Sequence, residues 1–406
     1  MTTIISLLGI CSLLAIAFAI SKHRSDISPR TIAGAFALQF IIGAFALYIP
    51  FGKSVLLSIS TGVSGIFSYG QSGINFLFGD IGTYKIGFVF AFHVLPIIIF
   101  FSALVAALYY LGIMGRIISV IGGGLQKILG TSRAESMSAT ANIFVSQTEA
   151  PMVIKPYIAN MTQSELFAVM VGGMATVAGS VLAGYVALGV EMKYLLAASF
   201  MAAPCGLLMA KMLLPEREQI VESDEVLKQE HDQYVNVIDA AAGGASAGLR
   251  LAVNIGAMLI AFVALIAMLN GFLGWVGSIV GIPDLSMQLV LGICFKPVAF
   301  MLGIPWSESS VAGSLIGQKL VLNEFIAFVD FAEQKQLLSA HSQAVVSFAL
   351  CGFANFSSIA ILLGGLGTIA PNRRADVAQL GFRAVAAAFM ANLMSAAIAS
   401  FFLSLA

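Results

Sequence analysis

Apolar residues along this chain gather into runs about as long as a bilayer is thick. A spanning α-helix needs roughly 20 predominantly apolar residues. Because a backbone inside lipid must satisfy its own hydrogen bonds, and strong β-strand patterns are missing, helices are the structure that these runs predict. We expect eight transmembrane helices, at about 3–21, 30–50, 86–113, 164–189, 194–214, 248–280, 342–370 and 376–405.

The stretches between these runs are too apolar for ordinary loops. Residues 53–79 alternate apolar and small polar positions with almost no charge, and 114–130 and 285–303 have a similar character. These patterns predict helices that lie in the membrane interface. Residues 131–160 and 304–332 are too interrupted for complete spans. Segments that enter the membrane and turn back fit both, so we expect two re-entrant hairpins.

Composition agrees with a membrane-embedded chain. Of its 406 residues, 59% are hydrophobic and 10% are charged, whereas a soluble domain carries about 25% charged residues. The formal net charge is zero, so no basic face indicates nucleic acid as a partner. The cysteines form no CxxC pair and the histidines no HExxH motif, so neither a zinc nor a redox site is indicated. The fold class is an all-α polytopic membrane protein.

The positions of the charges predict an orientation. Lys22 and Arg24 follow the first apolar run, which favours a retained first span over a cleaved signal peptide. With eight spans, most Lys and Arg residues fall on one side, and the positive-inside rule makes that side cytoplasmic. Both termini are then extracytoplasmic, in a multi-pass protein of the cell (inner or plasma) membrane.

Two parts of the chain resemble each other. GTSRAES begins at Gly130 and GIPWSES at Gly303, and a further glutamate follows each, Glu149 or Glu324. Each copy continues into a span with a polar centre, GMATVAGS in the fourth span and GFANFSS in the seventh. An odd number of crossings separates the copies, so they are inverted in the membrane, as is typical of transporters. Chance similarity between apolar stretches is the alternative.

The carboxylates are the first candidates for chemistry. A charged residue such as Asp at mid-membrane costs about 2.5–3.5 kcal/mol on insertion scales, so Glu149 and Glu324 are candidates for function. The alternative is a structural hydrogen bond to backbone or to a neighbouring helix. Glu135 and Glu308 lie near predicted helix starts, where a capping role fits equally well.

The neighbours of Glu149 indicate the kind of ligand. It follows Gln147 and Thr148, and Pro151 interrupts the helix there because proline has no backbone donor. A broken helix inside a membrane is tolerated where it lines a cavity or is buried in protein. No Lys or Arg lies in the weak centres of the fourth and seventh spans, although an anionic solute would need a fixed cation. An uncharged polar solute fits better.

Longer motifs resemble a known family. NIFVSQTEAPMVIKPYI, MATVAGSVLAGYV, NEFIAF and CGFANFSSIAILLGGLG closely resemble segments of the concentrative nucleoside transporters. The resemblance covers most of the chain and is densest at 130–190 and 235–372. It implies a homotrimer in membrane lipid, in which each protomer has a scaffold and a moving transport part. It also implies elevator-like transport coupled to a cation gradient.

This resemblance and the repeats together divide the chain. Residues 1–113 would form scaffold helices with an interfacial helix, and 215–280 a cytoplasmic loop with a long scaffold helix. The inverted repeats would occupy 114–214 and 281–406, each with an interfacial helix, a re-entrant hairpin, a broken helix and a further helix.

Carried over position by position, the resemblance implies a nucleoside site shared by the two repeats. Residues of the first repeat would face the nucleobase, and residues of the second would bind ribose hydroxyls. The base-facing residues are Gln147, Thr148, Glu149 and Val181, and the ribose-binding residues are Glu324, Asn355 and Ser358, with Phe353 packed on the sugar.

The resemblance also implies a sodium site. Asn142 and Thr176 would contribute side chains, and Val145 and Val177 backbone carbonyls. Proton-driven members of the family lack some of these groups, so Na⁺ is the expected co-transported ion. Ser146 stands where several members of broad selectivity have Gly, and its hydroxymethyl group could crowd a purine. We hypothesise a preference for pyrimidine nucleosides such as uridine.

Sodium-coupled import of nucleosides is therefore the leading interpretation. Proton coupling, or symport of another neutral polar solute, is the alternative within the same class. A passive channel is a further rival. An intramembrane enzyme with Glu149 and Glu324 as acid and base is the rival from another class, but no nucleophile, metal ligands or Asp pair stands in a recognisable arrangement. We expect a transporter rather than an enzyme.

Overall fold

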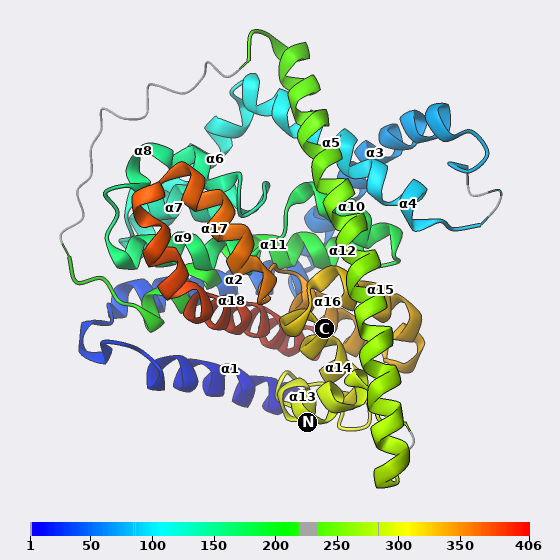
Figure 1. The fold of residues 1–406 in the computed structure, drawn as a ribbon. Helices are drawn as coiled ribbons and strands as arrows, with labels where there is room; N and C mark the ends of the chain where they lie inside the picture. The colour runs from blue at the N-terminus through cyan, green and yellow to red at the C-terminus, as the bar shows by residue number, and fades with distance from the viewer. Residues whose placement is uncertain (1, 84, 86, 219–233, 283) are drawn as a thin grey trace.

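The computed structural model describes residues 2–83, 85, 87–218, 234–282 and 284–406 (Figure 1). Within these ranges the regular structure is helical, which confirms the predicted all-α fold class. Residues 219–233, which are part of the predicted cytoplasmic loop, lie outside the described residues.

Five of the predicted spans are single continuous helices, and a sixth, the third along the chain, is a helix preceded by a short one. By length and hydropathy, seven segments of the described chain can cross a membrane. The predicted span 342–370 is not among them: its second half, Ser357–Ile369, is a shorter apolar helix by itself, whereas the two halves of the fourth span are counted together as Gln163–Ala187. The continuous helices are α1 (Thr2–Ala19), α2 (Pro29–Leu47), α5 (Leu95–Tyr110, preceded by α4, Phe90–His93), α11 (Met192–Leu213), α12 (Val237–Val280) and α18 (Arg374–Leu403).

The other two predicted spans are broken helices. The fourth consists of α9 (Gln163–Ala175) and α10 (Gly179–Ala187), and the seventh of α16 (Ala340–Leu350) and α17 (Ser357–Ile369). Each break coincides with the Gly-, Ser-, Thr- or Asn-containing centre, whose residues are poor helix formers and compete for backbone hydrogen bonds.

The three stretches predicted for the interface each fold as one helix: α3 (Pro50–Phe78), α6 (Ile113–Leu129) and α13 (Met287–Met301). In α6 the buried residues Met114, Ile118 and Leu125 recur at helical spacing, and this face packs against α7. Lying in the interface remains a prediction for all three helices.

Both predicted hairpins fold back on themselves. The first comprises α7 (Arg133–Ala141), η2 (Ala150–Ile154) and α8 (Lys155–Ile158), and the second α14 (Ser309–Val321) and α15 (Glu324–Gln334). In the second, Asn323 caps α15 by accepting a hydrogen bond from the Ile326 N–H at 2.9 Å, and this cap starts a new helix directly after the turn. Re-entry into a membrane stays a prediction.

Burial differs sharply between the helices. The apolar window of α9 and α10 is 100% buried within the protein, whereas that of α12 is 11% buried. In Figure 1, α12 runs along one side of the molecule and packs against α5, while α1 packs on α18. A broken helix leaves unpaired backbone groups, which a membrane tolerates only where the helix is buried in protein or lines a cavity. The breaks therefore lie where a shielded site can form.

Candidate functional site

The two breaks meet inside the protein. The backbone N–H of Phe353, between α16 and α17, donates to the carbonyl of Thr176, between α9 and α10, at 3.1 Å. Thr176 is 1% exposed. The polar backbone that each break uncovers is thus partly satisfied by the other break, which fixes the two repeats against each other.

Each hairpin also bonds to the break of its own repeat. The Gly179 N–H donates to the Phe144 carbonyl at 3.0 Å, and the Phe356 N–H donates to the Leu320 carbonyl at 3.2 Å. A Cβ at Gly179 would lie 2.8 Å from the Phe144 oxygen, so glycine is required for this approach. The sequence similarity between the two repeats therefore has a structural counterpart in these two equivalent hydrogen bonds.

Hydrogen bonds connect the first hairpin to the second break. Gln147 is buried, and its Nε2 donates to Ser358 Oγ at 3.3 Å across 211 residues of sequence. The Ser358 N–H donates to Asn355 Oδ1 at 2.9 Å. The Oε1 of Gln147 has no hydrogen-bond partner within the described chain. A buried acceptor without a donor is costly, so this oxygen is suited to a ligand.

Glu324 continues this chain of hydrogen bonds. It is the first residue of α15 and is 5% exposed. Its Oε2 accepts from Asn355 Nδ2 at 3.1 Å, and its Oε1 accepts from the hydroxyl of Tyr185 on α10, also at 3.1 Å. The carboxylate predicted to act in the second repeat is therefore held by both broken helices. Val181 is buried one turn before Tyr185 on α10.

Glu149 has a different environment. It is exposed, and its Oε2 accepts from both the N–H and the Oγ of Ser146 at 3.0 Å. The Ser146 hydroxyl also lies 3.0 Å from Thr148 Oγ1. No direct bond joins Glu149 to Glu324 in the described structure. Ser146 therefore sets the orientation of the Glu149 carboxylate at the hairpin tip.

The predicted sodium ligands are all buried. Asn142 ends α7 with 0% exposure, and its Nδ2 donates to the Ser138 carbonyl at 2.9 Å. Its Oδ1 finds no partner among the residues described. Val145 and Val177 are 4% and 0% exposed. An uncharged buried oxygen aimed at no donor fits a hard cation, so the residues present suit Na⁺.

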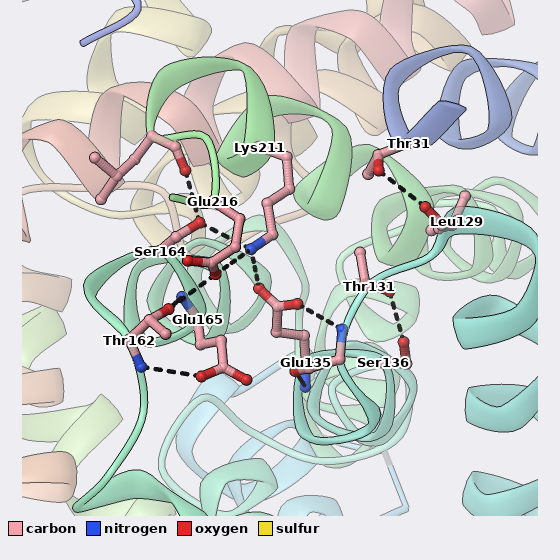
Figure 2. A network of polar contacts seen from close by, with 12 residues as sticks. Thr31, Leu129, Thr131, Glu135, Ser136, Thr162, Ser164, Glu165, Lys211 and Glu216 are labelled. Carbon is pink, nitrogen blue, oxygen red and sulfur yellow. Dashed lines mark hydrogen bonds and ion pairs between the residues drawn. The ribbon is translucent and has the colours of Figure 1, made fainter. Parts of the chain in front are cut away.

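The glutamates near the helix starts have structural roles. Glu135 forms a capping box with Ser132 at the start of α7 and an ion pair with buried Lys211 of α11 (Figure 2). Lys211 also donates to Ser164 Oγ at 2.8 Å. Glu308 accepts from the N–H and Oγ of Ser339, the residue that caps α16. These contacts anchor the ends of both hairpins away from the breaks.

Sequence reasoning missed four residues of the interior: Tyr185, Lys211, Lys319 and Asn392. All four carry polar groups in apolar segments, and each is buried. An ionisable residue within a membrane segment is itself a reason to look for function, so the two lysines had a usable signal. Tyr185 and Asn392 carry no full charge, so their signal was weaker, and their partners lie far away in sequence.

The structure has two broken helices and two hairpins around a buried polar site. In a helical membrane protein this is the architecture of a secondary transporter. Comparison with known families agrees. Residues 194–400 match the Na⁺ dependent nucleoside transporter C-terminus, and 8–81 match its N-terminus. Residues 91–192 match a nucleoside recognition (Gate) family.

Individual relatives give the same result. The nucleoside permease NupC of Helicobacter pylori is 49% identical over 100% of this chain and 99% of its own length. The human sodium/nucleoside cotransporter 1 is 39% identical over 98% of this chain and 63% of its own length. The solved structure of CNTnw in an inward-facing substrate-bound state is 54% identical and superposes with a TM-score of 0.96, covering 100% of this chain and 99% of that one.

The chain belongs to the family of Na⁺-dependent, concentrative nucleoside transporters. It is a multi-pass membrane transporter that couples nucleosides to sodium, and not an enzyme. A CNTnw variant solved in an outward-facing state, with a TM-score of 0.97, 54% identity and 100% coverage of both chains, complements the inward-facing structure. The family therefore works by alternating access.

Proposed function

We propose that the hairpin tips and the two breaks form one nucleoside site, in which the first repeat contacts the nucleobase and the second contacts the ribose. Gln147, Thr148, Glu149 and Val181 face the nucleobase. Glu324, Asn355 and Ser358 bind the ribose hydroxyls, and Phe353 packs on the sugar. The observation that carries this proposal is the unbroken line of hydrogen bonds from Gln147 through Ser358 and Asn355 to Glu324.

The groups present match a nucleoside in chemistry. A ribose has hydroxyls that both donate and accept, and Glu324 offers a buried carboxylate already oriented by two donors. The unpartnered Oε1 of Gln147 suits an N–H of the base. A site built to bond hydroxyls rejects solutes that lack them, since its own polar groups are then left unpaired.

Ser146 supports a preference for pyrimidine nucleosides such as uridine. Its hydroxyl contacts both Thr148 and Glu149, two of the proposed base-facing residues. The side chain thus adds bulk beside the base and fixes the carboxylate that reads it. A purine, with its second ring, would have less room there.

Sodium is proposed to bind Asn142 and Thr176 through side chains and Val145 and Val177 through carbonyls. The bond between Gly179 and Phe144 already holds these two segments together. A cation among their oxygens would stabilise the C-terminal end of α9, where the helix dipole is negative. It would thereby order the hairpin tip that faces the nucleobase, which couples ion binding to solute binding.

At the level of the whole protein, we propose elevator-like movement within a homotrimer in membrane lipid, with both termini extracytoplasmic. The two inverted repeats, 114–214 and 281–406, form the transport part, and 1–113 and 215–280 supply the scaffold. In support, α12 exposes many large apolar side chains, among them Ile260 and Met268, which need lipid or another copy to cover them. Membrane potential supplies about 2.3 kcal/mol per charge per 100 mV, enough for more than a tenfold solute gradient.

Flux measurements in proteoliposomes test the proposal. Radiolabelled sodium and uridine should enter together, and an imposed sodium gradient should drive uridine accumulation. Glu149→Gln should abolish uridine flux, and Asn142→Ala should weaken its sodium dependence. Uptake indifferent to the sodium gradient would indicate a channel, a response to a proton gradient alone would indicate proton coupling, and chemically altered uridine in the lumen would indicate an enzyme.

A further inference from the structure

Lys319 is a lysine with 0% exposure in α14, five residues before Glu324. Removing an ammonium group from water is costly unless other groups replace its hydration. Its Nζ donates to two neutral oxygens, the Ala349 carbonyl at 2.8 Å and Asn392 Oδ1 at 2.5 Å. The Phe389 ring lies 5.9 Å from the charge. The protein thus surrounds this cation with hard oxygens and an aromatic face.

Those oxygens belong to the end of a half-helix. Ala349 lies in the last turn of α16, where the carbonyls have no partner further along the helix and the dipole is negative. Asn392 of α18 donates from Nδ2 to the Cys351 carbonyl at 3.1 Å, just beyond the same helix end. A cation at this position stabilises the break of the second repeat.

The same amide reaches the other break. Asn392 Nδ2 also donates to the carbonyl of Ala175, the last residue of α9, at 2.6 Å. A Cβ at Gly352 would lie 2.3 Å from Asn392 Oδ1, so the second break leaves room only for a glycine here. One lysine and one asparagine therefore join the negative ends of α9 and α16.

The first repeat has a matching position. Leu320 accepts from Phe356 as Phe144 accepts from Gly179. Lys319 directly precedes Leu320, and Asn142, a proposed sodium ligand, precedes Phe144 by two residues. Lys319 and the proposed sodium ligand thus lie within one residue of equivalent positions in the two hairpins, each beside the carbonyl end of the first half-helix.

We propose that the Lys319 ammonium is a tethered cation that occupies, in the second repeat, the place that sodium occupies in the first. This inference rests on the proposed sodium site. Two negative helix ends converge in a region shielded from water, and each is stabilised by one cation. The sodium ion is exchangeable and couples transport to the gradient, whereas the Lys319 amino group is covalently attached to the hairpin. Lys319 is thus a positioning residue, and because of it transport requires only one sodium ion.

A pair of substitutions separates this role from packing. Lys319→Ala removes the charge and opens space beside Ala349 and Asn392, whereas Lys319→Met removes the charge and keeps the volume. We expect the Hill coefficient for sodium in uridine uptake to rise from about one in the parent to about two in Lys319→Ala, since a second ion can enter and cooperating sites set this limit. Lys319→Met should lose transport at all sodium concentrations.

A packing role makes the opposite prediction, because methionine fills the space better than alanine. Uptake by Lys319→Met close to that of the parent would overturn the proposal, as would an unchanged sodium curve in Lys319→Ala. Lys85→Met, which removes a lysine from an exposed ion pair with Asp80, is the control and should leave the curve unchanged.

A further measurement needs no substitution at Lys319. The reversal potential of uridine-coupled current in the parent should correspond to one sodium ion per uridine, and a ratio of two would overturn the proposal even if Lys319→Ala fails to fold.

Asn142→Ala distinguishes the proposed sodium site from the proposed role of Lys319. It should shift the sodium curve without steepening it, and an unshifted curve would remove the proposed sodium site while the Lys319 measurements still decide the charge requirement of the second repeat.

Discussion

Asn355 is the residue at which the two ends of the proposed ribose site converge. Its Oδ1 accepts from the N–H of Ser358, and its Nδ2 donates to Glu324. Because the amide uses its acceptor and its donor at the same time, it fixes the carboxylate of one hairpin relative to the start of α17. At the residue scale, site geometry therefore depends on amides and hydroxyls that hold a single charge in place.

Tyr185 should position Glu324 without contacting sodium. Tyr185→Phe removes one donor to the carboxylate and keeps the ring that packs 4.4 Å from Phe328. A hydrogen bond to a charged group contributes about 1.5–3 kcal/mol, so we expect KM for uridine to rise at least tenfold in uptake assays. Tyr69→Phe alters a largely exposed tyrosine and should leave KM unchanged. An unaltered KM in Tyr185→Phe would contradict this role.

Ser146 should govern the choice between bases. Ser146→Gly removes the hydroxyl that bonds Glu149 and Thr148 and the bulk beside them. We expect adenosine uptake to rise several-fold relative to uridine uptake, because a purine gains room, while uridine itself loses some affinity as Glu149 becomes less ordered. Competition of the two nucleosides against labelled uridine measures the ratio. Equal uptake of both by the parent would refute the preference itself.

At the scale of helices, the contacts between hairpin and break are made by backbone. In the first repeat this approach leaves no room for a side chain at Gly179 or Gly173, so both glycines have structural roles. A Cβ at Gly173 would lie 2.9 Å from that of Gln147. Each hairpin tip is in this way positioned by the helix break that it contacts.

Gly179→Ala tests this dependence. The added methyl would lie 2.8 Å from the Phe144 carbonyl, so the hairpin tip must move. We expect the sodium concentration for half-maximal uptake to rise roughly tenfold, corresponding to about 1.4 kcal/mol. Gly124→Ala on α6 has nothing within 4 Å and should be neutral or stabilising by up to about 1 kcal/mol. Equal sodium curves for the two variants would contradict the argument.

The ion pair at the far end of the first hairpin should contribute to stability rather than to selectivity. Lys211→Met leaves the buried carboxylate of Glu135 without its cation (Figure 2). Breaking a buried pair on one side costs about 3–5 kcal/mol, so the thermal midpoint in detergent should fall by several degrees. The double variant Lys211→Met/Glu135→Gln should recover part of the loss. A double variant as unstable as the single one would show that the charge is not the cause.

At the scale of the whole molecule, the helices divide into a buried interior, which includes α18, and an exposed outside, which includes α5. The window of α18 is 89% buried, against 22% for the segment containing α5. The proposed site lies among the buried helices, and both repeats contribute residues to it. Binding should therefore stabilise the contact between the repeats.

Ligand-dependent melting measures this coupling. A ligand at 100 times its Kd stabilises a protein by about 2.7 kcal/mol. We expect uridine to raise the thermal midpoint when sodium is present and to have much less effect when choline replaces it, because sodium orders the hairpin tip first. Asn142→Ala should lose the difference between the two salts. An equal shift by uridine in both salts with the parent would show that ion and solute bind independently.

Much of this organisation follows from local pattern. Bilayer thickness sets the length of an apolar run, and proline and glycine interrupt helices whatever surrounds them, so the spans, both hairpins and both breaks can be predicted from residue order. Glu324 stood out because an ionisable group is rare in such segments, whereas the roles of Gln147 and Asn355 were assigned through the resemblance to the family.

Long-range partners could not be predicted in this way. Gln147 contacts Ser358 across 211 residues, and Asn392 contacts Ala175 across 217, with no periodicity to connect them. Tyr185 and Lys319 acquire their roles only when packing brings a carboxylate or a helix end within hydrogen-bond distance. Sequence pattern establishes where a helix breaks, because that is a local backbone property, whereas which groups then satisfy the break depends on how distant helices pack.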